Sequence, residues 1–555
     1  MRGLLGVAGA AACLLVVFSA GGSAAGQSAR PDRQALAAQI LDSPAVLTAQ
    51  ARAALVQLAR GNQGLAADAG GVAGPSASSA ALAPTVAEPE PEASTFRNVR
   101  VNDPGEDVHQ TDQTTQSETT IAAVGRNVVV GFNDSQTALL VRTAGADFNG
   151  YAHSDDGGAS FTDGGAIPNR VGCINVGDPW LASDRTGAFY YSSLAECVSP
   201  SSFGLFVGVA KSIDGGRTFS APVILSPPSP TPFYEGDKDA MTAGRDPVVG
   251  ARENLYDTWD DFTFGATGPL SGLPVARSID GGQSWHSVYA AQVPLAAPCP
   301  GIKAFSFAQF IGAMPIVDPS SGKLYVAAEK LSRPCPTPGG PPPAQQRSEV
   351  IYASTDGGLH FGSEVKIADI KQAFPHDVMD LGPNRLMRTL EFPTLAFFNG
   401  ELFAAWNDGR SGHSHVLLST STNGATWSAP LPVTTGSSDE LQPAISGDGA
   451  GVHILHYQRH ANNTLDVRVA NSDNGTAFSE RRVTTVAFPG VLTFPQFDPI
   501  IAFAYMGDYI ANISTGDSQL FAWGDNRDIV KDFLFPGGRN DPDVFFARQG
   551  EGENG

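Results

Sequence analysis

An eight-residue pattern recurs six times between residues 154 and 478, and it constrains the fold more than any other feature of the sequence. Two copies are nearly identical, Ser212 to Phe219 (SIDGGRTF) and Ser278 to Trp285 (SIDGGQSW). A pattern that recurs through most of a chain indicates a fold assembled from similar units. The more divergent copies occupy residues 154–161, 354–361, 420–427 and 471–478.

Each copy has the composition of a tight turn between two strands. A strand-like apolar run precedes it, as at residues 205–210. The Asp can accept hydrogen bonds from backbone N–H groups across the turn, and Gly supplies the unusual backbone angles. The final aromatic residue begins the next strand and is expected to fill the core beneath the turn. We therefore predict a structural rather than a catalytic role for five aspartates: Asp156, Asp214, Asp280, Asp356 and Asp473.

The octapeptides resemble Asp-boxes, the repeats of sialidases and related β-propellers. The chain is more similar to a secreted sialidase-like protein than to a true sialidase. The resemblance implies an all-β propeller in which each box joins the third and fourth strands of a blade, on the face away from the active site. The composition agrees, because 62 Gly and 40 Pro, with only 16% charged residues against a usual ~25%, suit many short strands.

The rest of the repeat aligns into seven units, one more than the number of boxes. The first strands are predicted at residues 118–122, 178–182, 237–241, 312–317, 392–397, 442–446 and 507–511. Residues 95–101 resemble the strand that follows a box, although no box precedes them. We therefore predict that they complete the last blade and close the ring, which leaves few exposed edges. The prediction is a seven-bladed β-propeller over residues 95–550, with six blades and one insertion as the alternative.

The N-terminal region is predicted to be a signal peptide followed by an appendage. Residues 1–25 combine Arg2, an apolar run and small residues before a cut, as in a secretory signal peptide. A membrane anchor is the alternative, but the run of ~15 apolar residues is short of the ~20 that span a bilayer. Residues 26–60 have helical apolar spacing, and residues 61–94 form an Ala/Gly/Pro-rich linker. We expect a secreted protein, extracellular or periplasmic.

The charge balance excludes some classes of partner. Asp and Glu (56) outnumber Lys and Arg (35), which gives a formal charge of −21. Nucleic acids and anionic membranes need a basic face, so neither is expected, and no later stretch is apolar enough to span a membrane. We expect a monomer whose partner is an extracellular glycan or polysaccharide. No cofactor is required and no metal site is predicted, although a bound structural cation such as calcium is compatible with the acidic loops.

Four cysteines follow the signal peptide, and an even number in an exported chain indicates two disulfides. Sequence alone allows three pairings, and free buried thiols are the alternative. In the blades that the resemblance implies, one pair of cysteines flanks the first two strands of the second blade and the other pair those of the fourth. This arrangement favours the pairs Cys173–Cys197 and Cys299–Cys335.

In a propeller, the ligand face is formed by loops that enter the innermost strands and loops that link the second and third strands. The resemblance places six candidate catalytic residues there: Glu118, Asp178, Asp239, Glu391, Asp508 and Tyr509. Candidate substrate-binding residues are Arg388, Arg410, Arg527, Asp134, Asp408 and Asp525. The alternative is that these side chains cap strands and tie blades together. The W-x-D-x-R motif, repeated at residues 406–410 and 523–527, favours that alternative for its own residues.

The resemblance suggests two kinds of chemistry. Sialidases grip the substrate carboxylate with three arginines and use a Tyr–Glu nucleophile pair and an Asp acid/base. Tyr509 with Glu391 or Glu118 resembles that pair, but the Arg–Ile–Pro signature of the family is absent, so true exo-sialidase activity is not favoured. Xyloglucan hydrolases with seven-bladed Asp-box domains use paired aspartates instead. Two hypotheses follow: a glycoside hydrolase with paired carboxylates in the central funnel, or a non-catalytic propeller that binds a glycan or a protein.

Overall fold

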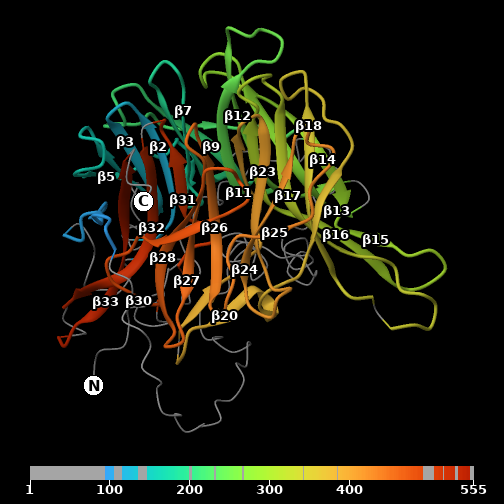
Figure 1. The fold of residues 1–555 in the computed structure, drawn as a ribbon. Helices are drawn as coiled ribbons and strands as arrows, with labels where there is room; N and C mark the ends of the chain where they lie inside the picture. The colour runs from blue at the N-terminus through green and yellow to red at the C-terminus, as the bar shows by residue number, and fades with distance from the viewer. Residues whose placement is uncertain are drawn as a thin grey trace, which may run out of the picture.

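The computed structural model describes residues 94–105, 115–135, 147–198, 203–229, 233–265, 268–341, 343–383, 385–491, 506–516, 518–531 and 536–550. Within these residues the secondary structure is β-strand, apart from a 3-10 turn at Pro375–Asp377 (Figure 1). The predicted all-β class is therefore confirmed. The predicted signal peptide (1–25), the helical segment (26–60) and the linker up to residue 93 lie outside the described residues.

The strands follow one another as antiparallel meanders, termed units here and numbered along the chain. Unit 1 contains β2 (Gln116–Val124), β3 (Asn127–Asp134), β4 (Asn149–Ser154) and β5 (Thr162–Ala166). Unit 2 contains β6 (Cys173–Asn175), β7 (Trp180–Ser183), β8 (Phe189–Val198), β9 (Phe203–Ser212) and β10 (Val223–Ile224). Unit 3 contains β11 (Phe233–Arg245), β12 (Glu253–Gly265), β13 (Gly268–Ser278) and β14 (His286–Pro294). Because β11 also pairs in parallel with β9, units 2 and 3 share one nine-stranded sheet.

The second half of the chain continues the series. Unit 4 contains β15 (Ala296–Pro298), β16 (Phe305–Val317), β17 (Leu324–Arg333), β18 (Gln346–Ser354) and β19 (Val365–Ile370). A hairpin of β20 (Val378–Asp380) and β21 (Leu386–Arg388) then precedes unit 5, which contains β22 (Thr394–Phe398), β23 (Glu401–Asp408), β24 (His415–Ser421) and β25 (Leu431–Pro432). Unit 6 contains β26 (Asp439–Gly447), β27 (Val452–Arg459), β28 (Thr464–Ser472), β29 (Ser479–Arg482) and β30 (Phe488–Pro489). Unit 7 contains β31 (Ala511–Ser514), β32 (Ser518–Val530), β33 (Arg539–Gly550) and β1 (Val99–Arg100).

The innermost strands of successive units lie next to one another around a common centre; they are β2, β7, β11, β16, β22, β26 and β31. β2 contacts β7, β7 contacts β11, β11 contacts β16, and the series continues through β22, β26 and β31. β31 in turn contacts β2, so the series returns to its start. No sheet of the described residues closes on itself, and the cyclic arrangement comes from the packing of separate sheets.

The predicted pairing of the N-terminal strand with the last unit is confirmed. β1 pairs antiparallel with β33, with Val99 opposite Phe546, and the Val101 N–H donates to the Val544 carbonyl at 2.8 Å. Phe96 packs edge-on against Phe521 with 6.0 Å between ring centroids. The two ends of the described chain therefore share one sheet, which removes an exposed edge.

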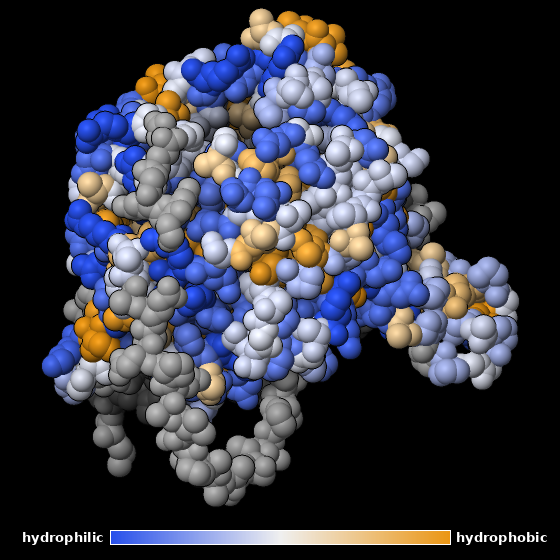
Figure 2. All heavy atoms as spheres, in the orientation of Figure 1, coloured by the Kyte–Doolittle hydropathy of each residue, from blue (hydrophilic) through white to orange (hydrophobic). Residues whose placement is uncertain are grey.

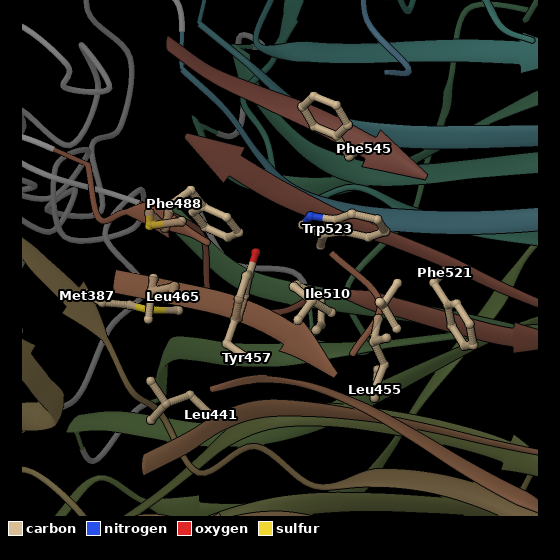
Figure 3. Packing of buried hydrophobic residues seen from close by; sticks show 14 of the residues in the cluster. Met387, Leu441, Leu455, Tyr457, Leu465, Phe488, Ile510, Phe521, Trp523 and Phe545 are labelled. Carbon is tan, nitrogen blue, oxygen red and sulfur yellow. The ribbon is translucent and has the colours of Figure 1, made fainter. Parts of the chain in front are cut away.

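The apolar cores lie between neighbouring units. The cluster shared by units 6 and 7 includes Leu455 and Tyr457 of β27 and Trp523 of β32 (Figure 3). The Tyr457 hydroxyl donates to the Gly524 carbonyl at 2.8 Å, so its polar atom is satisfied inside the core. Because each sheet packs on two neighbours, strands such as β32 carry continuous apolar runs instead of strict alternation. In the view of Figure 2 the outer surface is mainly hydrophilic.

The octapeptide turns have the predicted geometry in the first four copies. In the second copy, Asp214 accepts hydrogen bonds from the Thr218 N–H at 3.0 Å and the Thr218 hydroxyl at 2.6 Å. The Gly216 N–H donates to Ser212 Oγ at 3.0 Å. The aromatic residue that ends this copy, Phe219, is buried and packs at 5.0 Å against the Tyr151 ring. These turns therefore have a structural role and join the last two strands of their units.

The last two copies differ from the prediction. In the sixth, Asn474 accepts the hydrogen bonds from the Thr476 N–H (2.9 Å) and the Ala477 N–H (3.0 Å), so the assignment of this role to Asp473 is wrong. In the fifth, Asn423 takes the same place. Both turns are one residue shorter between the serine and the aromatic residue, which moves the acceptor from the position expected by alignment.

The role of Asn474 in the sixth turn can be tested by mutation. Asn474→Ala removes two backbone and two side-chain hydrogen bonds, and we expect it to lower the free energy of unfolding by about 1–3 kcal/mol. Asp473→Ala, one residue away, is the matched control and should change it by less than about 0.5 kcal/mol. Urea unfolding of both variants measures the difference. A larger loss in the Asp473 variant would contradict the corrected alignment.

Both predicted disulfides are present. Cys173 and Cys197 face each other across β6 and β8 with 4.1 Å between Cα atoms, and Cys299 bonds to Cys335 with 5.6 Å between Cα atoms. The second bond joins the two sides of the extension that projects from unit 4 at β15 (Figure 1). Two disulfides agree with an extracellular protein.

Candidate functional site

Most of the innermost strands contain, or are shortly preceded by, a residue that departs from strand geometry, termed an entry residue here. The affected residues have positive φ: Glu118 (55°), Asp178 (54°), Lys238 (30°), Gly312 (72°), Gln442 (50°) and Gly507 (86°). The strand pairing shifts register at this point in β2, β11, β16 and β26. A bulge of this kind bends the strand and re-aims a side chain. These entry residues therefore bring chemically different side chains from several units to one centre.

Two of the entry positions need glycine because of their neighbours. A Cβ on Gly312 would lie 2.3 Å from the Phe392 ring, and one on Gly507 would lie 2.7 Å from the Glu118 backbone nitrogen. Both residues also have positive φ, which other residues adopt with strain. Glycine at these positions makes room for the Phe392 and Glu118 side chains at the centre.

Three of the predicted catalytic carboxylates meet there. Glu118 accepts hydrogen bonds from Asn133 Nδ2 at 2.8 Å and from the Asp508 N–H at 3.1 Å. The Asp178 N–H donates to the Oδ1 atom of the same Asn133 at 2.9 Å. Burial, and then the carboxylates of Glu118 and Asp237, raise the pKa of Asp178 well above its usual value. Units 1, 2 and 7 thus contribute one acid each to a common group.

Asp508 combines an elevated pKa with a cationic neighbour. Burial raises its pKa to about 7, the Arg388 guanidinium 2.9 Å away opposes that rise, and Glu118 adds to it. Arg388 ends the β20–β21 hairpin, and its carbonyl is held by Gln442 Nε2 at 3.3 Å. The hairpin therefore places the buried guanidinium of Arg388 beside Asp508, which is one of the predicted catalytic residues.

Tyr509 lies at the centre but not in the form of a nucleophile. Its hydroxyl donates to the Pro179 carbonyl at 2.9 Å, and the side chain is buried. Burial, with further contributions from Glu118 and Asp178, raises the pKa of Tyr509 well above its usual value. A neutral phenol bonded to a backbone carbonyl is a positioned donor, whereas a Tyr–Glu nucleophile pair needs the phenol to lose its proton to the carboxylate.

Asp239 is linked to a second carboxyl, that of Asp257, through the hydroxyl of Ser192. Ser192 Oγ lies within hydrogen-bond distance of an Asp239 carboxyl oxygen and 2.5 Å from Asp257 Oδ2. A hydroxyl has one hydrogen, so these two contacts require one of the carboxyls to carry a proton. Burial accordingly raises the pKa of Asp239 to about 7 and that of Asp257 well above its usual value.

Glu391 belongs to a second buried group, which is organised by Arg347. Arg347 lies 2.6 Å from Glu391, 2.8 Å from Asp377 and 3.1 Å from Glu329. Asp377 follows His376 in the 3-10 turn, and both have positive φ. Burial, with Glu329 as the next cause, raises the pKa of Glu391 well above its usual value. One arginine thus holds three carboxylates from β17 and from the segments on either side of the hairpin.

The remaining predicted binding residues tie units together. In the W-x-D-x-R motifs, Trp406 and Arg410 both donate to Asp408, and Trp523 and Arg527 both donate to Asp525. Arg410 also donates to the Asp369 carbonyl at the end of unit 4, and Arg527 to Asn98. Asp134 accepts a hydrogen bond from Gln116 at 3.2 Å. These contacts join neighbouring strands and units, and none reaches the carboxylates at the centre.

An axial cavity of about 770 Å³ runs along the innermost strands. Residues from all seven units line it, and Lys238, Phe392 and Tyr509 are among them. Gly125 and Gly157, in turns at the opposite ends of the strands, also line it. Two of the entry residues, Lys238 and Gln442, therefore lie at one end of this cavity, and the first octapeptide turn, through Gly157, lies at the other.

Sequence reasoning missed Lys238, Arg347 and Asp377. Lys238 lies at the same place in its repeat as Glu118 and Asp178. The alignment of the repeats could therefore have identified it as a residue of the site. Arg347 comes from the start of β18, and Asp377 comes from the segment between β19 and β20. Neither belongs to a repeated position, so no pattern in the sequence could have placed them beside Glu391.

Some aspartates of this protein have a raised pKa and others a lowered pKa. From these two groups we predict that the protein is most stable in mildly acidic solution. Burial raises the pKa of Asp239, Asp261 and Asp508 to about 7, so their stabilising effect is complete below ~4 and is lost as pH rises through 7. Hydrogen bonds in the turns lower the pKa of Asp214 and Asp280 to about 2 despite some burial, so their effect is lost as pH falls from ~4 through 2. We expect the thermal midpoint to peak near about pH 4 and to fall as the pH rises towards 7. A midpoint that rises steadily from pH 5 to pH 8 would contradict this.

No protein-family model and no curated protein matches this chain. Among solved structures, an α-L-arabinofuranosidase of Fusarium graminearum in complex with an iminosugar inhibitor is 13% identical, with a TM-score of 0.38, and the match covers 67% of this chain and 92% of that one. A Trypanosoma rangeli sialidase in complex with an inhibitor is 13% identical, with a TM-score of 0.38 over 68% and 58% of the two chains. A phage phi92 endosialidase is 8% identical, with a TM-score of 0.40 over 82% and 69%.

These TM-scores are below 0.5, so the proposals that follow rest on the residues of this chain. Sialidases, whose repeats the octapeptides resemble, are among the matched structures. No helix within the described ranges is long and apolar enough to cross a membrane.

Proposed function

We propose that this protein is a secreted, seven-bladed, sialidase-like β-propeller that hydrolyses a glycosidic bond in an extracellular glycan. The seven meander units, the cyclic contacts of their innermost strands and the pairing of β1 with β33 support the seven-bladed ring. The units would then be the blades, and the entry residues would line the ligand face. We propose that it acts as a monomer, without a cofactor or a nucleic-acid partner.

The observation that carries the proposed activity is the meeting of Glu118, Asp178 and Asp508 at the centre, with the pKa of Asp508 raised by burial to about 7. Glycoside hydrolysis needs one carboxylic acid to protonate the leaving oxygen and one carboxylate to act as base or nucleophile. Burial raises the pKa of Asp508 to about 7, which suits an acid at neutral pH. Glu118 accepts two N–H hydrogen bonds, as an ionised carboxylate does. We propose Asp508 as the acid and Glu118 or Asp178 as its partner.

Exo-sialidase activity is not part of the proposal. It would need arginines free to grip a substrate carboxylate, whereas the candidate arginines contact the chain's own aspartates. Arg388 pairs with Asp508, and the two arginines of the W-x-D-x-R motifs pair with the aspartates of those motifs. Tyr509 donates to a backbone carbonyl and not to Glu118 or Glu391.

One observation favours a second candidate, a non-catalytic propeller that binds a glycan or a protein. Glu118 and Asp178 are each 1% exposed and Asp508 is 2% exposed, so little of any acid is open to a ligand. In that case the acids would serve to join the units at the centre of the ring.

A substrate panel separates the two candidates. The purified secreted protein would be incubated with aryl glycosides and with plant, fungal and animal polysaccharides, and released reducing ends would be measured. We expect turnover of at least one substrate class. Binding on a glycan array without turnover would replace the hydrolase with the binding propeller. If neither turnover nor glycan binding is found, a glycan-directed function is wrong.

A further inference from the structure

Lys238 is a buried lysine held in left-handed backbone at the centre of the ring. Its φ is 30°, and β11 shifts register between Asp237 and Asp239 on either side of it. Its side chain is among the largest that are fully buried in the described chain. Strain at a residue other than glycine persists only where the surroundings impose it, and it concentrates at functional sites. A buried charge in strained backbone therefore indicates a role beyond packing.

Three aromatic rings surround the Lys238 ammonium. Nζ lies 4.5 Å from the centroid of Trp180, 4.7 Å from that of Tyr509 and 5.9 Å from that of Phe392. It also donates to the Asp239 backbone carbonyl at 3.3 Å. Ring faces attract a cation and not a neutral amine, so this cage favours the charged form of the lysine. The rings come from units 2, 7 and 5, so three different units hold the Lys238 ammonium in its place at the centre.

Acidic groups face this cation from several elements. Burial lowers the pKa of Lys238, and the surrounding carboxylates oppose that change. The charge of Lys238 in turn acts to lower the pKa of Asp239, Asp257, Asp260 and Asp508, and Asp508 also pairs with Arg388. The acidic groups are Glu118 of β2, Asp178 at the entry to β7, Asp239 of β11, Asp257 and Asp260 of β12, and Asp508 at the entry to β31.

We propose that Lys238 is a positioning residue for the hydrolysis: its caged ammonium keeps one carboxylate of the Glu118–Asp178 pair ionised while Asp508 holds its proton. Carboxyls this close to one another and this deeply buried would otherwise each take up a proton, and no base or nucleophile would remain. The inference rests on the proposed function for its role in turnover. The electrostatic coupling between Lys238 and the acids is a property of the folded protein and is tested separately.

The test compares the pH profile of kcat/KM in the wild type with three variants. Lys238→Met and Lys238→Gln remove the charge, and Lys238→Arg keeps it. Loss of a cation raises the pKa of the nearby acids, so both limbs of the profile should move to higher pH by about 1–3 units. Lys238→Arg should return the limbs to within about 0.5 unit of the wild type, because it restores the charge. A role in packing alone would lower the rate without moving the limbs.

The outcomes are distinguishable from failure of the proposed function. Limbs that stay in place in both neutral variants would overturn the inference, and Lys238→Gln decides the matter if circular dichroism shows the Met variant to be unfolded. If the wild type hydrolyses nothing, the proposed function fails. The pH dependence of the thermal midpoint then tests the coupling alone: its decline on the alkaline side should move to higher pH in Lys238→Gln, and an unmoved decline would overturn the coupling too.

Discussion

Replacing Asp508 with asparagine is expected to reduce kcat about 10²–10⁴-fold on the glycoside that the panel identifies. Asparagine has nearly the same shape and can still accept a hydrogen bond from Arg388, but it has no proton to give to the leaving oxygen. The loss should be small, within about tenfold, for an activated dinitrophenyl glycoside, because that leaving group departs without protonation. The alkaline limb of the pH–rate profile, which we expect near the Asp508 pKa of about 7, should disappear.

The matched control for Asp508→Asn is Asp473→Asn, the same chemical change at an exposed turn remote from the centre. It should leave kcat unchanged. Equal losses for activated and unactivated substrates in the Asp508 variant would show that Asp508 is not the acid. An unaffected rate on both substrates would remove Asp508 from the reaction and direct attention to Asp178 or Glu391.

The second large effect is expected at Arg347. Arg347→Met removes a cation whose guanidinium lies within 3.1 Å of Glu329, Asp377 and Glu391, and all four side chains are at most 8% exposed. Breaking a buried ion group by removing one partner leaves uncompensated charge and destabilises by about 3–5 kcal/mol. Urea unfolding at pH 7.5 measures this. The loss should be smaller at pH 5, because the carboxyls left behind can protonate, and burial already raises the pKa of Glu329 to about 7.

An exposed arginine provides the control for this variant. Arg185 forms an ion pair with Glu253, but its side chain is 62% exposed. Arg185→Met should therefore change the free energy of unfolding by less than about 1 kcal/mol. If the Arg347 variant unfolds no more easily than the Arg185 variant, or loses as much stability at pH 5 as at pH 7.5, the buried group does not depend on its arginine.

The sequence alone predicted most of the scaffold, because the relevant forces act between residues that are close in the chain or that repeat. In the first four octapeptides the Ser, Asp and Gly form hydrogen bonds within eight residues, so a short pattern was enough to place the turns. The alignment of repeats then predicted the pairing of residues 95–101 with the last unit and both disulfides. The prediction failed at Asp473, where a deletion of one residue kept the turn but moved its acceptor to Asn474.

The charge pattern of the centre was decided by the tertiary structure. Glu118, Asp178 and Asp508 could be placed at strand entries from the repeat, but their protonation depends on burial and on neighbours hundreds of residues away. Arg388 reaches Asp508 across 120 positions, and the Lys238 cage draws on three different units. Burial and Coulomb interaction depend on distance in space and not on distance along the chain. A repeat therefore predicts at which strand an acid lies, and only the tertiary structure determines whether that acid keeps its proton.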